Sequence, residues 1–166
     1  RTELWTEQEL PYAQDEQAME AWFVRDCEAG IPEIYPSTLD TFILQQLNLQ
    51  ALGAVSFNKG CYTGQEIIAR MKFLGKLKKK MYLLKAPNDS ASSNINDLPA
   101  GTGIKNESGR KIGQVVRLHG ENELITGLVV CDIASIESQK ARVFFEDSSG
   151  ENSDQQAIEL SELHYD

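Results

Sequence analysis

The residue with the clearest capacity for chemistry is Cys61, which lies in a segment that also provides charge and backbone freedom. Residues 58–66 have the sequence NKGCYTGQE. Thr63 and Glu66 have the Thr-x-x-Glu spacing of a capping box, in which each side chain accepts a hydrogen bond from the backbone amide of the other residue. We therefore expect a helix to begin near Gly64, shortly after the cysteine.

The expected helix would favour the thiolate form of Cys61. The sulfur would lie ahead of a helix N-terminus, where partial positive charge stabilises anions. Lys59 adds a positive charge two residues away, and the thiolate is the form in which cysteine reacts. A lone cysteine is nevertheless more often a small buried apolar residue than a reagent, so the residues alone leave both interpretations open.

If Cys61 reacts, its surroundings favour a redox or ligand-contact role over acyl transfer. The chain has two histidines, His119 and His164, and neither is close to Cys61 in sequence, so no Cys–His dyad is predicted. His119 is expected in a turn, with its side chain in solvent. The three cysteines are far apart and form no Cys-x-x-Cys motif, so no zinc or iron–sulfur site is predicted.

The two residues after Gly64 have different expected roles. Glu66 is more simply a helix cap than a general acid or base. Gln65 has no local partner that the sequence indicates, which leaves its side chain available to a ligand.

The size and composition of the chain are those of a soluble globular protein. Its 166 residues are 41% hydrophobic and 25% charged. The net charge of −9 argues against a protein that coats nucleic acid non-specifically. No run of apolar residues is long enough to span a membrane, and three unpaired cysteines fit a reducing cytoplasm better than a secreted protein.

Six of the 16 basic residues are concentrated in one short stretch, which we call the lysine cluster. They are Lys72, Lys76, Lys78, Lys79, Lys80 and Lys85. A charged strand edge that resists aggregation explains the cluster about as well as an anion-binding patch for RNA or for the polyglutamate tail of a folate. The strand contains one aromatic residue, Tyr82, so stacking on bases is poorly supported.

The hydrophobic pattern of residues 1–74 predicts a mainly helical first part. Apolar residues at helical spacing predict a helix over 15–29, which Gly30 would end. Residues 39–52 are expected to form either a helix or irregular helical turns. Trp22, on the apolar face of the first helix, is most simply a core residue.

Residues 75–166 have the pattern of a small antiparallel barrel or sandwich, because short apolar runs alternate with turn residues. The expected strands are 77–86, 112–118, 123–130, 141–145 and 157–163, with a hairpin turn at 119–122. The whole chain is therefore expected to be α+β, with a domain boundary near residue 75.

The octet KGCYTGQE at residues 59–66 resembles the signature of the YgfZ family. Proteins of this family bind folate, are related to the T-protein (aminomethyltransferase) of the glycine cleavage system, and act in iron–sulfur enzyme maintenance and tRNA modification. The similarity extends in order from Trp22 to Arg70. It includes EAGIP at 28–32, NLQALG at 48–53 and VSF at 55–57.

The resemblance implies a cofactor, a site and partners. It makes Cys61 the functional, catalytic residue and Trp22 a contact to tetrahydrofolate or another folate derivative. The other matched motif residues are Lys59, Gly60, Tyr62, Gly64, Gln65, Glu66 and Arg70. The implied partners are folate and iron–sulfur enzymes, among them a tRNA-modifying enzyme, with weak tRNA contact as a further expectation and no membrane.

The resemblance also implies the carboxy-terminal part of a GcvT-like (T-protein-like) fold, in which an α+β segment precedes a small β-barrel. The family has a substantial amino-terminal region before the position of Trp22, and this region supplies much of the folate pocket. We therefore expect a carboxy-terminal fragment with an incomplete folate site. Leu44 and Ala54 depart from the family pattern, where proline is common and glycine is frequent, and this affects the expected turn geometry more than function.

Two other functions stay open. One is an aminomethyltransferase that acts on a lipoyl-bound aminomethyl group with tetrahydrofolate, although the T-protein generally lacks the cysteine of the octet. The other is an RNA-binding module that uses the lysine cluster. The residues alone do not decide whether the chain is an enzyme.

Overall fold

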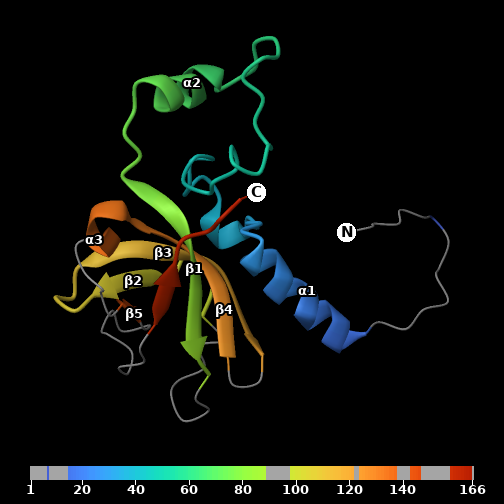
Figure 1. The fold of residues 1–166 in the computed structure, drawn as a ribbon, viewed down its shortest axis with the longest axis vertical. Helices are drawn as coiled ribbons and strands as arrows, with labels where there is room; N and C mark the ends of the chain where they lie inside the picture. The colour runs from blue at the N-terminus through green and yellow to red at the C-terminus, as the bar shows by residue number, and fades with distance from the viewer. Residues whose placement is uncertain are drawn as a thin grey trace.

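The computed structural model describes residues 7, 15–88, 98–121, 124–137, 143–146 and 158–165, and it has an α+β architecture. Figure 1 shows α1 lying against a curled sheet, and α2 held away from the sheet at the end of a long excursion of the chain. The elements, in order, are α1 (Glu16–Glu28), η1 (Pro36–Thr38), α2 (Gln65–Phe73), β1 (Lys79–Pro87), β2 (Gly103–Asn106), β3 (Lys111–Glu121), β4 (Leu124–Asp132), α3 (Ile133–Glu137), β5 (Val143–Phe145) and β6 (Glu159–Ser161).

The described strands form one antiparallel sheet of half-barrel shape. Their order is β5-β2-β3-β4-β1-β6, and each neighbouring pair is antiparallel. The predicted α+β class and the antiparallel, barrel-like second part are therefore confirmed at this level. A specific relation to the T-protein fold stays a prediction.

The predicted strands are found with shifted ends. The expected hairpin forms, but β3 continues through Glu121, so most of the predicted turn at 119–122 is strand. Strand β6 is shorter than the predicted one, because residues 158, 162 and 163 are not strand, and residues 141, 142 and 157 of the two last predicted strands lie outside the described ranges. Strand β2 was not predicted, because its glycine-flanked sequence has the appearance of a turn.

Helix α1 follows its predicted span closely. The Asp15 side chain caps the first turn by accepting a hydrogen bond from the Ala18 amide at 3.0 Å. At the other end, Gly30 has a φ of 66°, and the Ile31 amide donates to the Asp26 carbonyl at 2.8 Å. This is a Schellman ending, which favours glycine because an L side chain rarely adopts a positive φ.

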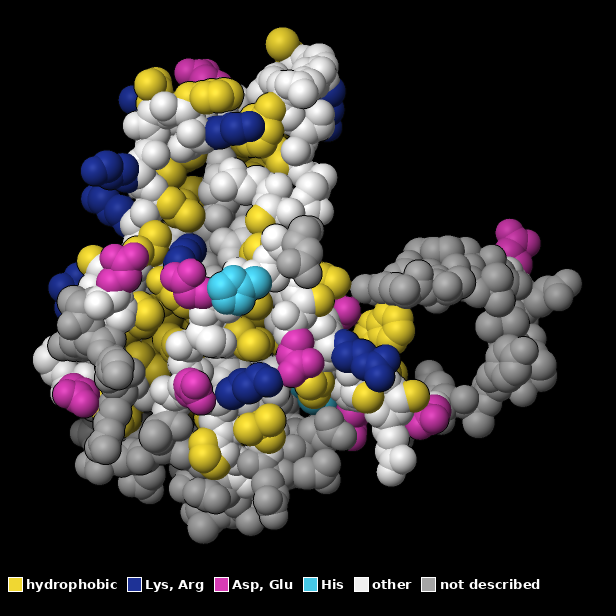
Figure 2. All heavy atoms as spheres, viewed as in Figure 1, with side chains coloured by type: hydrophobic (Ala, Val, Ile, Leu, Met, Phe, Trp, Pro, Cys, Tyr) yellow, Lys and Arg dark blue, Asp and Glu magenta, His cyan; other side chains and the backbone are white. Residues whose placement is uncertain are grey.

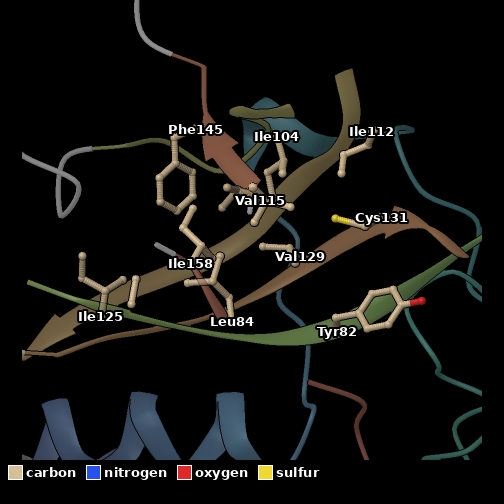
Figure 3. Packing of buried hydrophobic residues seen from close by; sticks show 12 residues of the cluster. Tyr82, Leu84, Ile104, Ile112, Val115, Ile125, Val129, Cys131, Phe145 and Ile158 are labelled. Atoms are coloured by element: carbon tan, nitrogen blue, oxygen red, sulfur yellow. The ribbon is translucent and has the colours of Figure 1, made fainter. Parts of the chain in front are cut away.

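Both faces of the sheet are packed. Figure 3 shows one buried cluster on the side of β1 and β4 away from α1, with Tyr82, Leu84 and Val129 among its members. A second cluster lies on the α1 side, where Cys27 of α1 packs against the opposite face. Its other buried members are Leu47, Met81, Val116, Leu128 and Val130.

The predicted helix over 39–52 is absent, and the alternative of irregular helical turns is correct. The structure has consecutive turns over residues 44–53, and Asp40 and Asn48 both adopt a positive φ. The Asn48 side chain donates to the Met81 carbonyl at 3.3 Å and to Tyr165 Oη at 3.2 Å. These bonds fix the turns on the sheet and provide the base from which the next segment extends.

Candidate functional site

The octet lies on an extension that we call the arm, residues 54–78. The arm leaves the turns that precede it, carries α2 at its far end and returns to β1 (Figure 1). No residue of α2 is buried. The octet is thus presented away from the sheet and not packed into the core.

Helix α2 begins where the sequence predicts, but the predicted capping box is not formed. Gly64 is the N-cap residue with a φ of 85°, and no side chain bonds to the cap. The left-handed turn at Gly64 places Thr63 before the cap, so the Thr63 hydroxyl and the Glu66 carboxylate do not make the reciprocal bonds. Glu66 instead lies exposed in the first helical turn, where a carboxylate interacts favourably with the helix dipole.

Gln65 has the local partner that the sequence did not indicate. Its side-chain Oε1 accepts a hydrogen bond from the Tyr62 backbone amide at 3.3 Å, and the Gln65 backbone amide donates to the Tyr62 carbonyl at 3.1 Å. The expectation that Gln65 has no local partner is therefore wrong. Gln65 closes the turn that follows Cys61.

Cys61 is the exposed thiol of the chain, whereas the other two cysteines are buried. Burial raises the pKa of the Cys27 thiol to about 11 and that of the Cys131 thiol to about 12. Both buried thiols are thus protonated at neutral pH and out of reach of solvent. Cys61 alone among the three has the accessibility that chemistry requires, in agreement with its position in the octet.

Lys59 and Tyr62 form a pair that flanks the thiol. The Lys59 Nζ lies 4.7 Å from the centroid of the Tyr62 ring, within cation–π range. The Lys59 ammonium is directed over the tyrosine ring, and an effect of its charge on the Cys61 thiol stays a prediction. Gly60 has open space around its Cα, with nothing within 4 Å of an added Cβ.

The structure does not bring Trp22 to the arm. Trp22 lies on α1 and is 37% exposed, so it is only partly the core residue that its pattern suggests. Figure 1 shows α1 and the loop before α2 in separate regions of the molecule. Arg70 is exposed on α2, with the rest of the octet helix.

The lysine cluster is divided into ion-paired and unpaired members. Lys80 Nζ lies 2.7 Å from Glu162, Lys85 Nζ lies 2.9 Å from Glu28, and Lys79 Nζ lies 3.9 Å from Asp132. The hydrogen bond from Lys80 lowers the pKa of the Glu162 carboxyl. Half of the cluster is thus neutralised on the sheet, which weakens its use as one continuous polyanion-binding patch.

The other three lysines belong to the arm. Lys76 and Lys78 are exposed and have no ion pair within the described part of the chain. Lys72 Nζ lies 3.6 Å from the centroid of the Phe57 ring. Figure 2 shows dark blue side chains along one side of the arm, with acidic side chains spread over the body below.

The prediction of a solvated His119 is wrong, because the extension of β3 places this residue inside the sheet opposite Thr126. Its ring lies 5.4 Å from the ring of Phe23 on α1. His119 Nε2 is buried with no hydrogen-bond partner among the described residues. His119 is therefore part of the contact between α1 and the sheet.

Arg117 is a buried charge that the sequence analysis missed. Its side chain is 4% exposed and lies 3.8 Å from Asp26 and 3.6 Å from Glu33. A register shift between Val115 and Arg117 in the pairing of β3 with β4 lets two consecutive residues face α1. Because of this irregularity, a strict alternation of inward-facing and outward-facing residues along the strand does not identify Arg117 as buried. The ion pairs hold the end of α1 and the following segment on the sheet.

A hollow of about 570 Å³ lies between the two limbs of the arm, above the turns at its base. Figure 2 shows the surface hollowed between α2 and the body of the molecule. Its lining residues are Gln45, Gln50, Ala51, Val55, Phe57, Met71, Lys72, Gly75 and Leu77. Neither Cys61 nor Trp22 lines this hollow, and no sequence pattern pointed to it.

No protein-family model matches this chain. No group of three or more potential metal-ligating side chains occurs within the described ranges. In the same ranges, the helices are all too short or too polar to cross a membrane.

Proposed function

We propose that this chain is a folate-binding accessory protein of the YgfZ type, in which Cys61 is the functional thiol. It would bind tetrahydrofolate or another folate derivative and support iron–sulfur enzymes, including one that modifies tRNA. The octet resembles the YgfZ signature over all eight positions, from Lys59 to Glu66. The remaining matches before and after the octet support the same proposal.

The single observation that carries the proposal is the placement of the octet. A reactive or contacting cysteine must be accessible, and Cys61 is exposed on the arm while Cys27 and Cys131 are buried. The arm projects from a packed sheet (Figure 1), which is a geometry that lets a client protein approach the thiol. Trp22 is a folate contact by resemblance alone, and the proposal does not depend on it.

The two alternative functions have less support. No observation on the structure specifically favours the aminomethyltransferase hypothesis. The T-protein of the glycine cleavage system, on which this hypothesis is based, generally lacks the cysteine of the octet. The RNA-binding reading requires a concentrated positive patch, whereas three lysines of the cluster are ion-paired to Glu162, Glu28 and Asp132.

The proposal predicts that the full-length protein, to whose folate site this chain contributes only a part, binds tetrahydrofolate and that Cys61→Ser separates binding from function. Calorimetric titration under anaerobic conditions should give saturable binding to wild-type protein, and the serine variant should bind with an affinity within about twofold. In cells that depend on the protein for iron–sulfur enzyme activity, the variant should lose nearly all support. Its melting temperature should match wild type, because the exposed side chain packs against little.

Absence of tetrahydrofolate binding would remove the cofactor from the proposal. A serine variant that supports the enzymes as well as wild type would remove Cys61. A Cys27→Ser variant is an unsuitable control, because that thiol is buried in the core.

A further inference from the structure

The hollow in the arm is a built feature, because contacts between the two limbs and the base hold it open. Gln45 Nε2 donates to the Ile68 carbonyl at 2.9 Å and so ties the base of the arm to α2. The rings of Phe57 and Phe73 meet edge to face, with centroids 6.4 Å apart, and tie the outgoing limb to the helix. The space between these contacts has the volume that small-molecule pockets typically have.

The chemistry of the lining is that of a site for an anion with an apolar body. The apolar walls come from both limbs, with Val55 and Phe57 on one side and Met71 and Leu77 on the other. Lys72 provides a cation beside the Phe57 ring. Among the nine described lining residues, none is acidic.

The polar groups at the base are amides. Gln45 is only 4% exposed, and its Nε2 is already engaged by Ile68. Gln50 lies in the same lining. Amides of this kind orient a ligand without adding charge, so the anionic preference of the hollow depends on Lys72.

The charge around the hollow differs in sign from that of the rest of the protein. The arm, residues 54–78, contains five basic residues and one acidic residue, a net charge of +4, so the rest of the chain carries −13 and the total is −9. A field of this kind draws small anions to the arm and away from the body.

We propose that the hollow binds the aromatic carboxylate part of its ligand, with Lys72 as the counter-ion and Phe57 as the apolar wall. For a folate, this part is the p-aminobenzoyl-glutamate half. The chemical class of the ligand is inferred from the lining of the hollow. Its identity as a folate rests on the proposed function.

The position of the hollow is compatible with a ligand that also reaches the thiol. Phe57 and Cys61 are four residues apart, so their Cα atoms are separated by at most about 14 Å even in a fully extended chain. A pterin ring carries no charge for Lys72 to neutralise. With the benzoyl-glutamate half in the hollow, the pterin half would lie outside it, and this separation is short enough for the pterin half to reach the thiol.

The test is calorimetric titration of p-aminobenzoyl-L-glutamate into the whole chain and two variants that lose the same charge. Lys72→Gln removes the cation of the lining and should weaken binding about tenfold or more. Lys76→Gln removes an exposed cation of the same limb that does not line the hollow, and it should change the affinity less than about twofold. Equal melting temperatures would show that both variants fold.

The outcomes separate this inference from the proposed function. Equal weakening by the two substitutions would show general electrostatic attraction and overturn the inference, as would a failure of the wild-type protein to bind the probe. If the Lys72→Gln variant binds tetrahydrofolate with the affinity of the wild-type protein, the inference is overturned and the proposed function stays intact. Lys72-dependent binding of the probe without any tetrahydrofolate binding would support the hollow as a site and contradict the proposed function.

Discussion

Replacing Gly113 by alanine should lower the free energy of unfolding by about 3 kcal/mol. Gly113 pairs with Cys131 of β4 on one side and with Ile104 of β2 on the other. A Cβ at this position would collide with Cys131 Sγ and with the Val130 carbonyl oxygen. The carbonyl belongs to the backbone of a central strand and cannot move aside without disturbing the ladder, so the sheet itself must distort.

Urea denaturation followed by circular dichroism measures this effect, and Gly60→Ala is the matched control. Gly60 has nothing within 4 Å of an added Cβ and does not adopt a positive φ. Its substitution should change the free energy of unfolding by less than about 0.5 kcal/mol. Equal stability of the two variants would contradict the close approach of Gly113 in β3 to Cys131 and the Val130 carbonyl in β4.

Alkylation of the folded protein should be confined to Cys61. Iodoacetamide labelling followed by mass spectrometry of peptides should show Cys61 modified at least about a thousandfold faster than Cys27 or Cys131, because the buried thiols react only in molecules that have unfolded. Burial raises the pKa of both buried thiols, to about 11 and about 12. Both thiols therefore remain protonated well above neutral pH, and raising the pH to about 8.5 should not open them to labelling.

The control is Cys61→Ser, which should leave the folded protein almost unlabelled while all remaining cysteines react in strong denaturant. Rapid labelling of Cys131 in the folded variant would contradict the buried cluster in which that residue lies.

The raised pKa values of the buried thiols also set the direction of any alkaline effect on stability. Unfolded chains lose these protons near the ordinary thiol pKa, whereas the folded chain keeps them until pH exceeds the raised values. The native state therefore binds more protons between about pH 9 and the raised values, and stability falls as pH rises through that window.

The sequence predicted best those features that depend on local periodicity. The spacing of apolar residues in α1, with Asp15 before it and Gly30 after it, was enough to locate the helix. The hairpin of β3 and β4 was also found, because both strands are long apolar runs. The ends were less well placed, since the pattern does not show how far pairing continues beyond the apolar residues.

The failures have physical causes that a local pattern cannot contain. The capping box failed because Gly64 adopts a left-handed conformation, which moves the start of the helix past Thr63. The burial of Arg117 depends on a bulge and on carboxylates from α1 and the segment that follows it. The hollow combines residues about thirty positions apart along the chain, and only the folded arm brings them together.

The octet is the part of the candidate site that the sequence indicated most directly. Its cysteine is exposed, and Lys59 and Tyr62 lie together beside it. Trp22 was expected near the same ligand, yet it belongs to α1 and not to the arm. The residues that line the hollow have no sequence signature, because apolar side chains and amides occur throughout the chain.

The most direct test of a folate site beside an exposed thiol is the rate at which iodoacetamide modifies Cys61 with and without tetrahydrofolate. If the bound ligand covers the thiol, tetrahydrofolate at about ten times its dissociation constant should slow modification about tenfold, in proportion to the fraction of protein that remains unliganded. An unchanged rate at a concentration that calorimetry shows to be saturating would place the ligand elsewhere and contradict the account.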